Sequence, residues 1–468
     1  MKKNFRDLIL NLIIALLAFS MIVLLLTYAG RKADRESSES NVFDKLWIIG
    51  DYDESAFSAL NASLCTPELI AYKQPGSQPG ALYADEETIS TVYSVLSDTV
   101  LDVFGADSVC ISDNIDAKAL ANELANAQSY ILYEYSADIP FPYIYALATG
   151  ESSVDVSSRA DGKAAYISKL ALILSEGEDN SVYYSPVAFD SNGGAYRFEK
   201  KDKTPYVLPG SDIIHLYAYA SSFERVKFYA NTQNGSLSTE IIHPGITYAP
   251  LSASPSSAFL ELDNDIIKTA FLELFELNPE KLNSFVERDG TTVFIGTAER
   301  LSVAPDGIIE FESNNEPMPL NSILGYTPGK NNSYTLFDML KATDLLISRF
   351  RSAYPEYIGK NASIKLTGVY KGDGEYTDSP IFEYSYFYEG MRIDTEPAFR
   401  FVFTSTGVSA IRINSLGFAP LAQRRSTLSK STVFDRIALR FSDDISVRPI
   451  YTLSENGVYE LEWAAYVS

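Results

Sequence analysis

Histidine and cysteine are scarce in this chain, which has only two residues of each type. A closed zinc site needs four cysteine or histidine ligands at tight spacing, whereas Cys65, Cys110, His215 and His243 are scattered. A nucleophilic triad needs a base, but His215 lies in an apolar, strand-like run and His243 precedes a Pro-Gly turn. We therefore expect no catalytic, metal-binding or cofactor-binding residues. The cysteine spacing leaves open whether the two form a disulfide.

Basic residues are also few, since 38 Lys and Arg stand against 61 Asp and Glu and give a formal net charge of −23. Nucleic acids require a basic footprint, so we expect no nucleic-acid partner. The same acidity repels anionic lipid head groups and argues for a solvated body that does not adhere to a membrane through its surface. A role of the charge in solubility alone fits equally well.

Common catalytic motifs are missing as well: there is no G-x-S-x-G and no H-E-x-x-H sequence. Residues 325–330 resemble a P-loop but have one residue too few between the glycines, and Asn331 stands where Ser or Thr is needed. The acidic segments 263–265 and 372–375 do not continue into an EF-hand ligand series. We interpret these segments as loops or caps and predict that the protein is not an enzyme. Paired carboxylates of the glycosidase type remain the enzymatic alternative.

A long apolar run is present at residues 8–29, interrupted only by Asn11, Ser20 and Thr27. A helix of this length spans a hydrocarbon core about 30 Å thick. A cleaved signal peptide is the alternative, but its apolar core normally has about 7–15 residues. We therefore predict a cytoplasmic tail and transmembrane anchor at residues 1–30, in a single-pass protein of the cell membrane with a cytoplasmic N-terminus and an extracytoplasmic body.

One stripe of this run has the spacing of a helix face. Asn11, Ala15, Ala18 and Ile22 follow one another at steps of four and three residues. Small residues let helix backbones approach closely in lipid, and an intramembrane Asn can hydrogen-bond a neighbour. We predict that these four residues contact a partner helix. The alternative is a chance arrangement, because alanine is common.

The body repeats one pattern three times, an amphipathic helix followed by alternating strands. The helices are expected at residues 85–104, 264–277 and 336–354, each with an apolar face at helical spacing. A shorter helix is expected at 117–128. We therefore predict an α+β fold: an N-terminal transmembrane helix followed by three units, each a helix packed on an antiparallel sheet.

Turn-rich segments near residues 201–210 and 325–332 suggest where these units meet. The predicted strands lie between such turns, at residues 130–135, 142–147, 164–174, 182–189, 195–200, 284–287, 292–296, 300–304 and 307–312. We predict a linker at residues 31–41, followed by three domains. These are a first extracytoplasmic domain at 42–205, a central domain at 206–328 and a C-terminal domain at 329–468.

Aromatic residues alternate along the last predicted strands. Tyr384, Tyr386 and Tyr388 are followed by Phe399, Phe401 and Phe403, each at a period of two. This period predicts one buried face of a sheet. Exposed tyrosines that stack on sugars are the alternative interpretation.

The arrangement resembles the YycH family of two-component-system regulators. The likeness rests on the apolar N-terminus, on residues 278–280, 286–294 and 306–311 with their repeated x-G-x turns, and on residues 384–393 with their aromatic strand and glycine turn. The last segment is similar to the related YycI proteins, so the C-terminal domain is expected to be YycI-like. The chain departs from the family after this turn, where Met391-Arg392-Ile393 replaces the usual Pro-Val pair. The first domain matches least well.

The resemblance implies a function. Such proteins bind a membrane sensor histidine kinase that controls cell-wall metabolism. They act with YycI, and their transmembrane helices contact the helices of the kinase. The chain is then a non-enzymatic, membrane-anchored regulator that biases a two-state kinase and needs no cofactor. The alternative is an extracytoplasmic module that binds the cell wall or a polysaccharide.

Overall fold

The fold is seen in a computed structural model of the whole chain. Residues 54–468 form one compact unit. The structure describes residues 67–83, 99, 102–103, 108–111, 117–140, 166–177, 181–190, 194–208, 224–225, 227–230, 239–242, 245–255, 265–313, 317–325, 334, 336–354, 358–371, 380–438 and 445–467.

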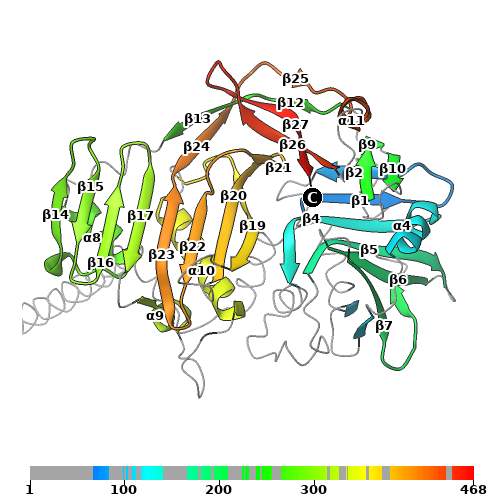
Figure 1. Cartoon of the computed structure of the whole chain (residues 1–468), viewed down its shortest axis with the longest axis horizontal. Coiled ribbons are helices and arrows are strands. Elements are labelled where there is room, and N and C mark those ends of the chain that lie inside the picture. The colour runs from blue at the N-terminus through cyan, green and yellow to red at the C-terminus, as the bar shows by residue number, and fades with distance from the viewer. Residues whose placement is uncertain are drawn as a thin grey trace, which may run out of the picture. The chain divides into compact units, whose positions relative to one another are not determined.

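The first large sheet has nine strands in the order β3-β7-β6-β5-β4-β1-β2-β9, with β8 paired to β6 (Figure 1). Neighbouring strands of this sheet run antiparallel throughout the described residues. Its strands are β1 (Leu69–Lys73), β2 (Gly80–Tyr83), β3 (Ser108–Ile111), β4 (Tyr130–Pro140), β5 (Tyr166–Glu176), β6 (Val182–Phe189), β7 (Ala195–Lys200), β8 (Tyr206–Leu208) and β9 (Glu224–Arg225).

The second large sheet has fourteen strands in the order β14-β15-β16-β17-β23-β22-β20-β21-β26-β27-β13-β24, with β18 on β23 and β19 on β20. Its strands are β13 (Leu251–Pro255), β14 (Asn283–Val286), β15 (Thr292–Ile295), β16 (Glu299–Val303), β17 (Ile308–Ser313), β18 (Met318–Pro319), β19 (Ser363–Lys371), β20 (Pro380–Tyr388), β21 (Met391–Ile393), β22 (Phe399–Phe403), β23 (Gly407–Asn414), β24 (Leu416–Pro420), β26 (Ile445–Leu453) and β27 (Tyr459–Val467).

Two short ribbons and five helices complete the described part of the chain. The ribbons pair β10 (Lys227–Ala230) with β11 (Thr239–Ile242), and β12 (Thr247–Tyr248) with β25 (Arg425–Ser426). The helices are α4 (Ala117–Asn126), α8 (Asp265–Leu274), α9 (Leu320–Leu324), α10 (Leu336–Ala353) and α11 (Lys430–Ala438).

The core of the first sheet forms against α4. Leu120 and Leu124 lie one helical turn apart, so both point to the same side of the helix. They join a buried cluster with Leu69, Leu132 and Ala171, which stand on neighbouring strands β1, β4 and β5. The apolar spacing predicted a helix at residues 117–128, and α4 buries that apolar side against the sheet.

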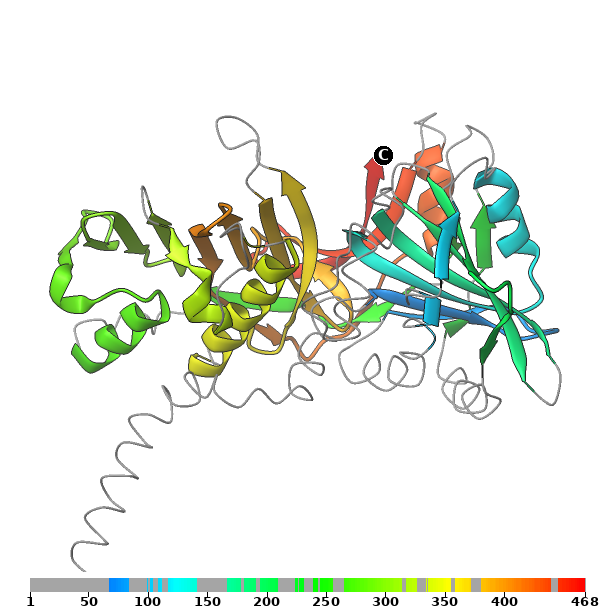
Figure 2. The same ribbon diagram turned by 90° about the horizontal axis from the view of Figure 1, so that it is seen from below.

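The core of the second sheet is rich in aromatic residues. The helices α8 and α10 lie on one side of this sheet (Figure 2). Phe275, just after α8, stacks on Phe311 of β17 at 5.7 Å and lies 5.1 Å from Phe350 of α10. Phe350 in turn lies 6.0 Å from Phe399 of β22. The helices and strands therefore share one apolar layer, in which aromatic pairs add about 0.5–1.5 kcal/mol each beyond area burial.

Two hairpins of this sheet use the same turn chemistry. Gly290 and Gly307 have φ of 91° and 90°, a region that a residue with a Cβ rarely adopts. In each turn the preceding aspartate, Asp289 or Asp306, accepts a hydrogen bond from the backbone two residues on. The turns connect β14 to β15 and β16 to β17, as the two Asp-Gly sequences predicted.

The predicted fold class is wrong. Among the described residues 52% lie in strands and 19% in helices, and the sheets are large, so the body is not a trio of small helix-on-sheet units. The strands expected in separate central and C-terminal units form one sheet, because β17 pairs with β23 from Ile308↔Asn414 to Glu312↔Ala410. Local periodicity specifies strands but not their partners across a hundred residues, which is why the prediction failed. The domain boundaries themselves stay predictions.

The predicted localisation is also corrected. In the described part of the chain, the structure contains no helix long and apolar enough to cross a bilayer. We therefore withdraw the prediction of a single-pass protein of the cell membrane with an N-terminal transmembrane helix. The segment 8–29 on which it rested lies outside the described residues.

Single helices and strands were predicted better than the way in which they combine into sheets. The expected helices at residues 117–128, 264–277 and 336–354 are confirmed as α4, α8 and α10. The expected strands at 182–189 and 195–200 are confirmed with the same bounds as β6 and β7. The helix predicted at 85–104 lies largely outside the described residues, and the strand at 142–147 lies wholly outside them.

Candidate functional site

A row of charged residues crosses the face of the second sheet opposite its aromatic core. Strand β22 buries Phe399, Phe401 and Phe403, so the alternation of side chains places Arg400 on the other face. The strand register then sets Arg400 beside Glu383 of β20 and beside Arg412 of β23. Arg412 is in turn opposite Glu310 of β17. We call Glu383, Arg400, Arg412 and Glu310 the charged row.

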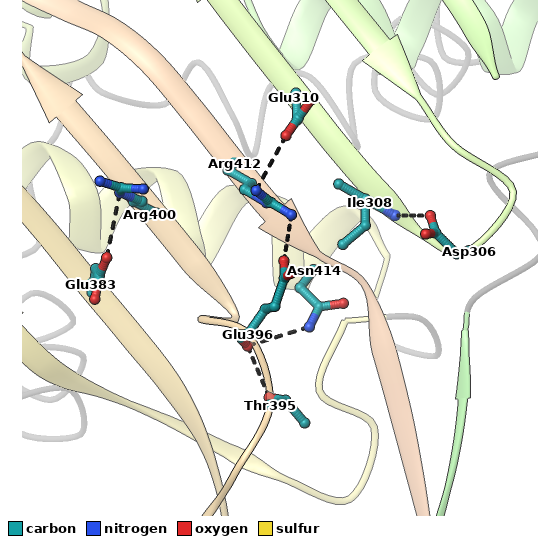
Figure 3. A network of polar contacts seen from close by, with 9 residues as sticks. All are labelled: Asp306, Ile308, Glu310, Glu383, Thr395, Glu396, Arg400, Arg412 and Asn414. Atoms are coloured by element: carbon teal, nitrogen blue, oxygen red, sulfur yellow. Dashed lines mark hydrogen bonds and ion pairs between the residues drawn. The ribbon is translucent and has the colours of Figure 1, made fainter. Parts of the chain in front are cut away.

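The charged row is held together by ion pairs (Figure 3). Arg412 lies 3.5 Å from Glu310 and also pairs with Glu396, which follows β21 in the chain. The backbone carbonyl of Glu396 accepts a hydrogen bond of 3.3 Å from the side-chain amide of Asn414. Arg400 pairs with Glu383 at 3.4 Å. Arg412 therefore joins three segments that are distant in the sequence.

The solvent exposure of the side chains determines how much the charged row contributes to the stability of the fold. The side chains of Arg400, Arg412, Glu310 and Glu396 are 45%, 39%, 43% and 58% exposed. Exposed ion pairs typically stabilise a fold by about 0–1 kcal/mol, because water screens them and ordering the side chains costs entropy. The row is therefore a minor element of stability, and its charged atoms are accessible to a partner.

A second cluster of charges is buried where the two large sheets meet. Strand β4 of the first sheet contacts β19 of the second (Figure 1), and the Ser136 hydroxyl donates a 3.1 Å hydrogen bond to the carbonyl of Leu366. Arg448 of β26 reaches across, 3.6 Å from Glu68 and 3.5 Å from Glu134. We call this contact region the seam.

Two lysines complete the seam. Lys169 of β5 lies 3.8 Å from Glu134. Lys365 of β19 is fully buried, donates to the carbonyl of Pro67 at 3.5 Å and lies 5.2 Å from the centre of the Phe387 ring. Buried charges are found almost only where they are paired, which the seam achieves with residues of both sheets.

Electrostatics distinguish Glu68 within this cluster. Burial raises the pKa of the Glu68 carboxyl, and this effect exceeds the opposing attraction of Arg448. The neighbouring Glu134 raises the pKa further, whereas Lys365 and Arg392 lower it. A carboxyl group with such a pKa takes up a proton more readily than one in water.

A third polar site lies inside the second core. Asp344 of α10 is 1% exposed, and its Oδ1 accepts a 3.2 Å hydrogen bond from the Tyr384 hydroxyl. Its other carboxylate oxygen is buried without a hydrogen-bond partner. Burial therefore raises the pKa of Asp344 well above its usual range, and the Tyr384 hydrogen bond only partly opposes this. The carboxyl serves as the acceptor for a buried tyrosine.

The residues predicted to contact a partner helix are not among those that the structure describes. Asn11, Ala15, Ala18 and Ile22 lie outside the described residues, and so do Cys65, His215 and His243. Gly325 has φ of 74° and ends α9, which accords with its interpretation as a loop glycine. In the part of the chain that the structure describes, no group of three or more His, Cys, Asp or Glu side chains is placed to hold a metal ion.

The aromatic strand is confirmed as part of the core. Tyr384 and Tyr386 are fully buried, and Phe399, Phe401 and Phe403 pack on the same side. Tyr386 donates a 2.5 Å hydrogen bond to the carbonyl of Asn414. These tyrosines are therefore inaccessible to a sugar.

Sequence reasoning missed both charge clusters. Arg400 and Arg412 each alternate with buried apolar residues, which marks them as outward-facing but gives no sign that they are adjacent. Lys365 stands between Ile364 and Leu366, a pattern that normally places a lysine in solvent. It is buried only because the first sheet packs on this strand.

No family model, curated protein or solved structure matches this chain. The YycH resemblance therefore stays a prediction.

Proposed function

We propose that this chain is a non-enzymatic regulatory protein that binds a sensor histidine kinase of a two-component system controlling cell-wall metabolism. A YycI-like protein is its proposed second partner. The kinase would have two states, and the bound regulator would favour one of them by contacting it more strongly.

The observation that carries this proposal is the charged row. Its Glu310 on β17 lies in segment 306–311, which carries part of the YycH resemblance, and its Glu383 on β20 directly precedes segment 384–393. The two arginines lie on β22 and β23 between them. Accessible charged side chains favour binding of a partner whose surface carries complementary charges. They also fix the orientation of the two proteins and repel partners with like charges. The opposite face is covered by helices and filled by aromatic residues, and the first sheet covers this face at β19. We therefore propose the exposed area around the charged row as the binding surface.

The polysaccharide-binding alternative has lost its main support. It depended on exposed Tyr384, Tyr386 and Tyr388. Tyr384 and Tyr386 are fully buried and are engaged with Asp344 and Asn414, and Tyr388 is half-buried. A sugar platform needs an accessible aromatic face, which these residues do not present. The regulator is therefore the function that the described residues support better.

The test is an affinity purification of the full chain from its source organism, with mass spectrometry of the proteins recovered. The test bait carries Arg400→Gln and Arg412→Gln, which remove both positive charges from the charged row and replace them with shorter, polar, uncharged side chains. The matched control is Arg197→Gln, because Arg197 of β7 in the first sheet pairs with Glu123 of α4 at 2.6 Å and is similarly exposed, at 34%.

We expect the wild-type and Arg197→Gln baits to recover a sensor histidine kinase, and the double variant to recover at least tenfold less. Equal recovery of the kinase by all three baits would support the regulatory function but would show that the charged row is not the binding surface. Absence of any histidine kinase from all three would contradict the proposal.

A further inference from the structure

The seam between the two large sheets is connected by long polar contacts. The distances from Arg448 to Glu68 and Glu134, 3.6 and 3.5 Å, exceed the roughly 2.7–2.9 Å of a strong charge-assisted hydrogen bond. The bond from Lys365 to the Pro67 carbonyl is also long, at 3.5 Å. Interfaces between parts of one chain move relative to each other unless they are large and apolar. These contacts therefore suit a joint that opens.

Glu68 is the residue at the centre of this joint. It stands just before β1 of the first sheet, and its backbone N–H donates a 2.7 Å hydrogen bond to the carbonyl of Glu134, so its position is fixed from that side. Glu68 as a whole is 5% exposed to solvent. The charged groups that act on it come from both sheets: Glu134 on β4, Lys365 on β19, Arg392 on β21 and Arg448 on β26.

We propose that the seam is a proton-controlled latch, in which the two large sheets part locally at β4 and β19 and closure takes up a proton at Glu68. Opening would bring Glu68 and Lys365 into water together, because each is buried by the opposite sheet. The proposal goes beyond the regulatory function above and does not depend on it.

The direction of the pH effect follows from burial. In the open state Glu68 is hydrated and titrates near its ordinary pKa of 4.5, whereas in the closed seam burial raises the pKa. The closed state therefore binds a proton that the open state releases. Closure is most favourable below about pH 4.5 and weakens as pH rises towards the pKa of the closed state. Arg448 limits the effect, because its attraction stabilises the ionised carboxylate in the closed seam.

Hydrogen exchange of the full chain tests this directly. Protection of the peptides covering residues 67–73 and 363–371 is measured from pH 5 to 8 and corrected for the chemical exchange rate. A peptide covering Phe399–Phe403, in the buried core of the second sheet, serves as the internal reference. In the wild type we expect protection at the seam to lie below that of the reference at every pH and to fall with pH by at most about tenfold per pH unit.

Two variants separate the latch from a general loss of stability. Glu68→Gln has the shape of the protonated residue, so seam protection should stay high and lose its pH dependence. Arg448→Met removes the attraction that lowers the pKa of Glu68 in the closed seam, so the pH at which protection stops falling should shift upwards and the total loss of protection should be larger. Glu199→Gln, at an exposed residue of β7 outside both the seam and the charged row, should behave as the wild type.

Equal pH dependence in the wild type and Glu68→Gln would overturn the proposal. Seam peptides that follow the reference peptide at every pH would also overturn it, because the sheets would then open only by global unfolding. Should Glu68→Gln fail to fold, the direction of the shift in Arg448→Met decides the question.

Discussion

The buried carboxyl of Asp344 leads to a prediction about stability. Asp344 lies on α10 in the aromatic core, where one carboxylate oxygen accepts from Tyr384 and the other has no hydrogen-bond partner. Replacement by asparagine keeps the size and the oxygen that Tyr384 needs, but removes the titrating group. We expect Asp344→Asn to stabilise the fold at neutral pH.

The magnitude follows from linkage. The unfolded chain ionises Asp344 near pH 3.8, whereas burial raises the folded pKa well above that value. The folded state therefore retains a proton that the unfolded state releases, and it loses stability as pH rises from 3.8 towards the folded pKa. Each pH unit is worth about 1.4 kcal/mol, so the gap up to pH 7 limits the gain in Asp344→Asn to at most about 4 kcal/mol.

Urea unfolding followed by near-ultraviolet circular dichroism, at intervals from pH 4 to 8, measures this gain. The two proteins should be nearly equal at pH 4 and diverge as pH rises. Tyr384→Phe provides a control of opposite sign, because it removes the hydrogen bond that lowers the pKa of Asp344 and should destabilise the fold. A difference between Asp344→Asn and wild type that does not vary with pH would refute the reasoning.

Two further predictions concern packing in the same sheet. Gly407→Ala should lower the unfolding free energy by about 1–3 kcal/mol, since a Cβ at this position would lie 2.3 Å from the backbone carbonyl oxygen of Met318; an unchanged thermal midpoint would contradict this. Tyr386→Phe should cost about 1–2 kcal/mol in chemical denaturation, because it leaves the buried carbonyl of Asn414 without its hydroxyl donor. Tyr370→Phe, at a residue that is 49% exposed, is the control and should change less.

The mixed success of the sequence predictions has a physical explanation. The helix at residues 336–354 and the aromatic strand around Tyr384 were predicted because each carries its own period of apolar residues over seven or more positions. The turns at Gly290 and Gly307 were predicted because a positive φ favours glycine at a specific place. Such signals are local, and tertiary packing here agreed with them.

The fold class was predicted wrongly because it depended on assembly. Three helix-and-strand patterns suggested three separate sheets, but Ile308 and Asn414 belong to neighbouring strands of one sheet. The period of a strand identifies which side chains face inward and leaves the choice of neighbouring strand open. The same limit hid the charged row, which exists only where β17, β23, β22 and β20 lie side by side.

By itself, the sequence determined the acidic character of the protein, the types of its main described elements and the buried side of its aromatic strands, since composition and period depend on neighbouring residues alone. The tertiary structure decided which distant groups meet. Lys365 has the local pattern of a solvated lysine, yet it is buried beside Pro67, nearly three hundred residues away in the chain. Its burial, and the raised pKa of Glu68, arise because another sheet excludes water from that strand, and water exclusion is a property of the assembled fold.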